Sequence, residues 1–174
     1  STESNDGNLT GYAPVNGLNM YFEIHGEGTP LVLIHGGGST IQTTFGKVLN
    51  KLAENNKVIA VEMQAHGHTA DIDRPLSFEK DADDIAELLK YLKIDKANIF
   101  GFSNGASTTL QFAIRHPELT SKIIVASTFY KKSGAPDWFW EMMSKPTFEG
   151  MPHPYKDAFL KNNPDTNALH RMYE

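Results

Sequence analysis

The sequence contains no cysteine, which excludes disulfide bonds, thiolate metal sites and a cysteine nucleophile. It also lacks an excess of positive charge, because 16 Lys+Arg stand against 21 Asp+Glu for a formal net charge of −5. That balance argues against nucleic acid as a partner. Its longest uninterrupted apolar runs are four residues, as in 31–34 and 123–126, whereas a membrane-spanning helix needs about 18 or more. We therefore expect a soluble protein with no membrane partner.

The N-terminal stretch is polar and turn-prone, and it begins at Ser1 without an initiator methionine. Either tag removal or signal-peptide cleavage leaves such a start, and the lack of cysteine fits any compartment. Both a cytoplasmic and an exported location therefore stay open. We expect residues 1–11 to be a disordered tail.

Strand and helix signals alternate along most of the remaining chain. The clearest helix covers 77–92, where apolar residues recur at steps of three and four. This alternation predicts an α/β fold: a mostly parallel sheet covered by helices on both faces, with one or two antiparallel strands from an N-terminal hairpin. The expected strands are 12–15, 18–24, 31–34, 57–61, 97–102 and 122–127, and the other expected helical segments are 45–52 and 105–115.

The composition changes after residue 129. Residues 130–174 contain both tryptophans, four of the six methionines and five of the nine prolines. This pattern is typical of short helices and predicts the start of a helical lid over a core formed by 12–129. Its aromatic and methionine side chains either pack the lid or form the wall of an apolar pocket.

The strongest chemical signal is Gly101-Phe102-Ser103-Asn104-Gly105, which has the form G-x-S-x-G and lies between an expected strand and an expected helix. A sharp turn there strains the serine backbone, and side chains in place of Gly101 and Gly105 would collide with neighbouring elements. The turn exposes the Ser103 hydroxyl, while the helix N-terminus supplies unpaired N–H groups. Ser103 is therefore the candidate catalytic nucleophile.

A second signal, His35-Gly36-Gly37-Gly38-Ser39, follows the apolar run 31–34. By itself it predicts only a flexible glycine turn. A serine nucleophile, however, needs two convergent N–H donors for the oxyanion, one from the residue after the serine and one from the loop after an earlier strand. We assign these donors to Asn104 and Gly37, with Gly38 as the alternative to Gly37.

Residue types suited to a metal occur in one loop, where His66 and His68 lie near Asp71 and Asp73. Two histidines at i and i+2 without a third well-spaced ligand match zinc and iron sites poorly. The sequence also has no G-x-x-x-x-G-K-[ST] pattern, and no expected strand is followed by G-x-G-x-x-G. We predict no metal and no other cofactor.

Taken together, these motifs resemble the α/β-hydrolase superfamily, in its branch of esterase and lactonase-like enzymes. The resemblance covers about residues 12–129, and it implies a serine nucleophile with the triad order Ser, acid, His. The loop 62–69 departs from the superfamily's usual pattern Asp-x-Arg-Gly-x-Gly-x-Ser, but this loop is structural and does not affect the nucleophile. The resemblance rests on His35-Gly36-Gly37-Gly38, the loop 62–69, the run 71–75, the turn around Ser103 and Arg115-His116-Pro117-Glu118.

Catalysis by Ser103 also requires a histidine base and an acid that orients it. His116 lies at the far end of the helix that begins at Ser103, about 18 Å away by helical rise, and cannot reach it. His153 and His170 fall in the lid stretch without the strand context that the resemblance implies. We therefore expect the histidine and the acid of the triad beyond residue 174, and a sheet that is incomplete at its C-terminus. The 174 residues alone are expected to be inactive without the missing part, which either continues the same chain or is a separate chain.

The leading functional hypothesis is a hydrolase of carboxylic esters or lactones. Superfamily relatives that cleave carbon–carbon bonds or amides use the same parts, so the motifs cannot separate them. A hypothesis from another class is a protein that binds a small ligand on a hydrolase scaffold with little turnover. The substrate is expected to carry an apolar acyl or alcohol group, as suggested by Trp138, Phe139, Trp140, Met142 and Met143.

Overall fold

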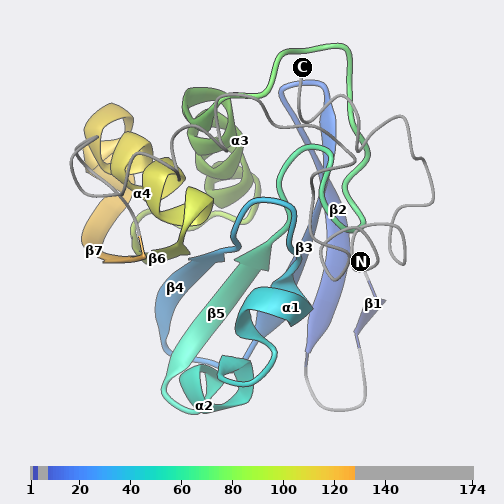
Figure 1. The fold of residues 1–174 in the computed structure, drawn as a ribbon. Helices are drawn as coiled ribbons and strands as arrows, with labels where there is room; N and C mark the ends of the chain where they lie inside the picture. The colour runs from blue at the N-terminus through green and yellow to red at the C-terminus, as the bar shows by residue number, and fades with distance from the viewer. Residues whose placement is uncertain (1, 4–7, 128–174) are drawn as a thin grey trace.

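A computed structural model describes residues 2–3 and 8–127 of the chain, and its centre is one sheet of seven strands (Figure 1). The strands lie in the order β1-β2-β3-β5-β4-β6-β7. Their bounds are β1 Thr2–Glu3, β2 Leu9–Val15, β3 Leu18–His25, β4 Thr29–Ile34, β5 Asn56–Val61, β6 Ala97–Phe102 and β7 Thr120–Ala126.

Strands β5, β4, β6 and β7 are parallel, and β1 to β3 join them as an antiparallel N-terminal extension. Ile34 at the end of β4 pairs with Val61 of β5 and with Gly101 of β6. The carboxyl ends of these three strands therefore meet at one edge of the sheet, which is where α/β proteins bind their ligands.

Helices cover both faces of the sheet, which confirms the predicted α/β class (Figure 1). One face packs against α3 and α4 and forms the larger apolar core, while α1 and α2 cover the other face with a smaller core. The bounds are α1 Ile41–Phe45, α2 Leu49–Ala53, α3 Phe78–Tyr91 and α4 Asn104–Arg115, and a 3₁₀ turn covers Pro117–Leu119.

Two segments differ from the sequence expectation. Instead of the one helical segment expected over 45–52, the structure has two short helices, α1 and α2. Thr40 starts α1 with a capping box, and Gly46, a poor helix former, ends it. Two parts of the expected disordered tail lie in strands instead: residues 2–3 form β1, which pairs with β2, and residues 9–11 belong to β2, where they pair with 22–24 of β3. The predicted lid, 130–174, lies outside the described residues.

A buried ion pair connects helix α3 to the loop that precedes it. The Arg74 guanidinium donates two hydrogen bonds to the Asp84 carboxylate, at 3.1 and 2.6 Å, and the Asp84 side chain is fully buried. Gln64 accepts two further bonds from Arg74, and Asn16 donates to Asp84. The loop before α3 is thus tied to the helix by charge-assisted bonds.

Replacing Arg74 by methionine should lower the free energy of unfolding by about 3 kcal/mol, because a buried carboxylate would lose its counter-ion. Arg115→Met is the matched control, since the Arg115–Asp83 pair at 2.7 Å is exposed to solvent and should contribute much less to stability. Urea denaturation at pH 7 measures both losses. Equal losses in the two variants would contradict the assignment.

Among the helices of the described residues, none has the length and hydrophobicity required to cross a membrane.

Candidate active site

Ser103 lies at a sharp turn between β6 and α4, with backbone angles φ 56° and ψ −118°. L-residues rarely adopt such a positive φ, so the strained conformation expected from the sequence is present. The backbone is fixed on both sides: the Ser103 N–H donates to the Ala126 carbonyl at 2.9 Å, and the Ser103 carbonyl accepts from Ala106 and Ser107. Its hydroxyl does not cap the helix as an N-terminal serine usually does, which leaves the oxygen available for chemistry.

The flanking glycines let three backbone segments meet at this turn. A Cβ atom on Gly101 would collide with the carbonyl oxygen of Gly105. A Cβ atom on Gly105 would collide with the carbonyl oxygens of Ile34 and His35 at the end of β4. The helix behind Ser103 therefore packs directly on the backbone of β4 and β6, and only glycine permits that approach.

The glycine loop after β4 lies against this turn, as the oxyanion hypothesis requires. A Cβ atom on Gly36 would lie 3.6 Å from the Ser103 Cβ, and one on Gly37 would overlap the Asn104 side-chain amide. The parallel pairing of β4 with β6 brings the two loops together, because it aligns the ends of the two strands.

The backbone N–H groups of this loop have different partners. Gly36 donates to the Thr44 hydroxyl at 3.2 Å, and Gly38 donates to His66 Nε2 at 2.9 Å. In the described part of the chain, the N–H groups of Gly37 and Asn104 have no hydrogen-bond acceptor. Gly38, the alternative donor considered from the sequence, is thus already committed, and Gly37 with Asn104 are the candidate donors.

Two buried histidines hold the glycine loop in place. His35 Nε2 accepts from the Met63 N–H at 3.0 Å and His66 Nε2 accepts from Gly38, so the proton of each ring is on Nδ1. Each Nδ1 then donates to a backbone carbonyl, of Gly36 and of Gln64. Burial, together with the neighbouring His66, lowers the pKa of His35 to about 3, and burial lowers the pKa of His66. Both rings are neutral supports of the loop.

No histidine among the described residues hydrogen-bonds to Ser103. His116 instead bonds Asp83 at 2.8 Å, at the far end of α4. His153 and His170 lie outside the described residues. The described residues therefore bring no histidine into hydrogen-bond contact with Ser103.

The loop that departs from the superfamily pattern is held by Glu62. Its buried carboxylate accepts from the N–H groups of Ile41 and His68, at 3.2 and 2.9 Å, and lies 2.6 Å from the His68 ring. A Cβ atom on Gly67 would collide with that carboxylate, which explains the glycine there. Ala65 adopts φ 63°, a conformation that glycine would adopt without strain. This loop is structural, and it places His66 under the glycine loop.

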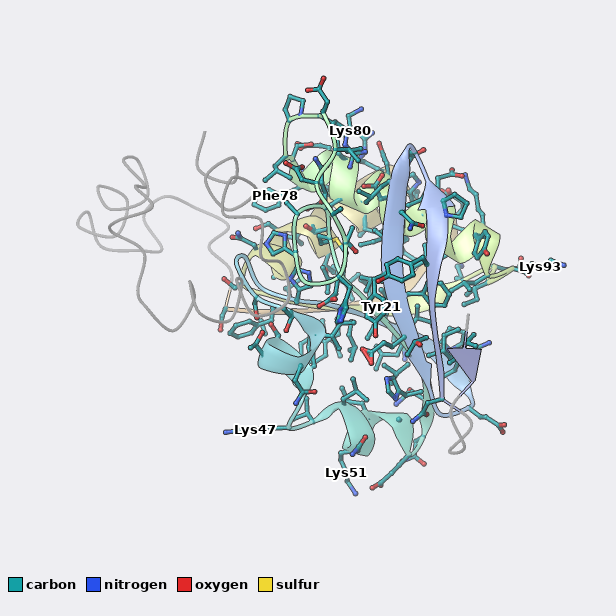
Figure 2. All side chains as sticks on the ribbon, turned by 90° about the vertical axis from the view of Figure 1, so that its right-hand side faces the viewer. Tyr21, Lys47, Lys51, Phe78, Lys80 and Lys93 are labelled. Carbon is teal, nitrogen blue, oxygen red and sulfur yellow. The ribbon has the colours of Figure 1, made fainter. Side chains whose placement is uncertain are left out.

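A cavity of about 390 Å³ opens beside the candidate oxyanion donors. Its walls come from the glycine loop, the loop after β5 and the beginnings of α3 and α4. Figure 2 shows Phe78 and Lys80 together at the beginning of α3, at the opposite end of the molecule from Lys47 and Lys51. The described lining residues are His35, Gly36, Gly37, Met63, Gln64, His66, Leu76, Ser77, Phe78, Glu79, Asp81, Asn104, Gly105 and Thr108.

The contribution of α3 to this cavity is not among the sequence-based predictions. Asp81 follows Phe78 by three residues and precedes Ile85 by four, so it lies on the apolar stripe of the helix. A carboxylate on the apolar stripe of this helix is the sequence signal that could have predicted a residue facing the cavity. Burial, together with the neighbouring Asp84, raises the pKa of Asp81 to about 7.

Comparison with known proteins supports the same family. The family model described as alpha/beta hydrolase fold matches residues 29–165. The chain is 35% identical over 119 residues to the human protein named Serine hydrolase BPHL, an alignment that covers 64% of this chain and 40% of that protein. It is 33% identical over 126 residues to a proline iminopeptidase of Clostridioides difficile, covering 68% of this chain and 43% of that enzyme.

Among solved structures, the enol-lactonase from Burkholderia xenovorans LB400 superimposes with a TM-score of 0.71 at 26% identity, covering 93% of this chain and 66% of the enzyme. The chain spans about two fifths of the length of the two curated relatives described above. The strand-to-helix turn at Ser103, the glycine loop beside it and the family match over most of the chain lead to one conclusion: this chain belongs to the alpha/beta hydrolase fold family.

Proposed function

We propose that the protein is a serine hydrolase of carboxylic esters or lactones, with Ser103 as its nucleophile. The observation that carries this proposal is the contact between the strained turn at Ser103 and the glycine loop. Two further observations support it: the N–H groups of Gly37 and Asn104 have no acceptor among the described residues, and the Ser103 hydroxyl is not used for capping. Such donors stabilise the negative charge that develops on a carbonyl oxygen under attack.

In the proposed reaction, the Ser103 Oγ attacks the carbonyl carbon and its proton passes to a histidine base. The tetrahedral oxyanion accepts hydrogen bonds from the N–H groups of Gly37 and Asn104. The carbon–oxygen bond to the leaving alcohol then breaks, and the alcohol takes the proton from the histidine. Water, deprotonated by the same histidine, then attacks the acyl carbon, the bond from that carbon to Ser103 Oγ breaks, and Oγ takes the proton back from the histidine as the acid leaves. The histidine and its acid come from outside residues 8–127.

The names of two relatives support this class of chemistry, since one is called a serine hydrolase and another an enol-lactonase. A proline iminopeptidase among the relatives supports the alternative of amide cleavage by the same residues. Parallel turnover assays with p-nitrophenyl acetate, a γ-lactone and proline p-nitroanilide separate these reactions. A protein that binds such compounds without turnover would instead be a receptor on a hydrolase scaffold.

A fluorophosphonate reagent tests the nucleophile directly. We expect one adduct in the intact mass of the folded protein that includes the histidine and its acid, located on Ser103 by peptide mapping, because only an activated serine attacks phosphorus at a useful rate. Heat-denatured protein is the control and should stay unlabelled. A folded protein that hydrolyses esters but carries its adduct on another residue would overturn the assignment.

A further inference from the structure

The described wall of the cavity beside the candidate oxyanion donors carries acidic side chains and no basic ones. Among its described lining residues, Glu79 and Asp81 are the only charged side chains, because burial keeps His35 and His66 neutral. Neither lysine nor arginine contributes to this part of the wall. A ligand group that neutralises a carboxylate would therefore be favoured here.

Asp81 differs from the two other aspartates of its helix. Asp83 is paired with Arg115 and His116, and Asp84 is paired with Arg74. The Asp81 carboxyl, although partly buried, makes no hydrogen bond within the described part of the chain. A partly buried carboxyl that lacks a partner is costly unless a ligand supplies one.

The rim of the cavity suits a cation with apolar substituents. Phe78 and Leu76 are 40% and 38% exposed, and both line the cavity close to Asp81 in sequence. The face of an aromatic ring attracts an ammonium group. Methyl substituents on that ammonium group would be stabilised by apolar contact with the same side chains. The carboxylate and the aromatic ring are carried one helical turn apart, at positions 78 and 81 of α3.

We propose that Asp81 is a specificity-determining residue that binds the positively charged group of an ammonium-bearing ester in this cavity. The proposal rests on the proposed function, because the cavity adjoins Gly37 and Asn104, the candidate oxyanion donors. An ester whose carbonyl oxygen lies at those donors can extend its charged end toward α3.

Binding of the cation by Asp81 depends on pH, and the charges around Asp81 determine the pH at which it changes. Burial and, to a smaller extent, Asp84 raise the pKa of Asp81 to about 7, whereas Arg74, which is bonded to Asp84, lowers it. Among the described residues of the cavity wall, the other titratable groups are Glu79 and the neutral rings of His35 and His66. Asp81 is charged above its pKa, so cation binding strengthens as the pH rises through about 7.

Calorimetry with choline and its uncharged isostere 3,3-dimethylbutan-1-ol tests the proposal. Choline keeps its charge at every pH, so any pH dependence comes from the protein. We expect choline to bind about tenfold more tightly at pH 8 than at pH 6, in proportion to the ionised fraction of a group with a pKa near 7. The isostere should bind with little change. Choline that binds no better than its isostere at pH 8 would overturn the proposal.

Three variants separate Asp81 from its neighbours. Asp81→Asn should remove both the preference for choline and its pH dependence, while Glu79→Gln should retain the pH dependence. Asp95→Asn makes the same chemical change at an exposed position outside the cavity and should behave as the parent protein. Loss of the pH dependence in Glu79→Gln but not in Asp81→Asn would assign the recognition to Glu79 and overturn the proposal.

Hydrolysis of acetylcholine and of 3,3-dimethylbutyl acetate distinguishes this inference from the proposed function. The ratio of their kcat/KM values cancels the titration of the shared catalytic groups, so its rise of about tenfold from pH 6 to pH 8 would report Asp81 alone. Turnover of both esters with a flat ratio near one would overturn the inference and leave the proposed function standing. Choline binding that depends on Asp81, without turnover of either ester, would support the inference and overturn the proposed function.

Discussion

Ser103→Ala should lower kcat for ester hydrolysis by about 10⁴-fold or more while the protein stays folded. The loss is large because the nucleophile and its base act as a unit, so removing one removes nearly the whole effect. The fold should persist, because the backbone bonds of Ser103 to Ala126, Ala106 and Ser107 do not involve its side chain. Initial rates with p-nitrophenyl acetate and the circular dichroism melting curve measure the two quantities.

Ser121→Ala is the matched control, since this serine is exposed on β7 and remote from the turn. It should keep both the parent activity and the parent melting temperature. A Ser103→Ala variant with more than about a tenth of the parent activity would show that another group forms the covalent intermediate. The proposed nucleophile would then be wrong.

Gly105→Ala should lower the free energy of unfolding by about 3 kcal/mol, the upper part of the range for an overpacked core. The added methyl group would collide with the backbone carbonyls of Ile34 and His35, and a backbone atom cannot swing aside as a side-chain end can. Relief requires α4 to move away from β4, which also moves Asn104 away from Gly37. We therefore expect ester turnover to fall together with stability in urea denaturation.

Gly36→Ala provides the internal comparison for this prediction. A Cβ atom there would lie 3.5 Å from the Phe102 ring and 3.6 Å from the Ser103 Cβ, which is ordinary van der Waals contact. Its free energy of unfolding should change by less than about 1 kcal/mol. Similar losses in the two variants would mean that general glycine flexibility, and not the close approach of α4 to β4, governs stability here.

The close approach of β4 and β6 links stability to the proposed chemistry. The register that pairs Ile34 with Gly101 also brings the glycine loop to the turn at Ser103. His35 and His66 then lock the loop through four backbone contacts. A preformed arrangement of donors avoids reorganisation during the reaction, which is the main source of such electrostatic stabilisation.

Local sequence determined much of this protein. The alternation of short apolar runs with amphipathic stretches predicts the α/β class, and the expected strand 97–102 coincides with β6. The pattern G-x-S-x-G, placed between an expected strand and an expected helix, predicts the strained turn at Ser103, because a sharp strand-to-helix turn needs glycine on both sides of the serine. Such features depend on residues adjacent in the chain, so they need no knowledge of distant contacts.

The tertiary structure decided which of the candidate groups are available. Gly37 and Gly38 are equivalent in the sequence, and only the approach of His66 from another loop shows that the Gly38 N–H is occupied. Asp81 and Asp84 both lie on one helix, and only the position of Arg74 shows that one is paired and the other faces the cavity. Pairing between residues far apart in the chain depends on strand order and packing, which a local pattern does not contain.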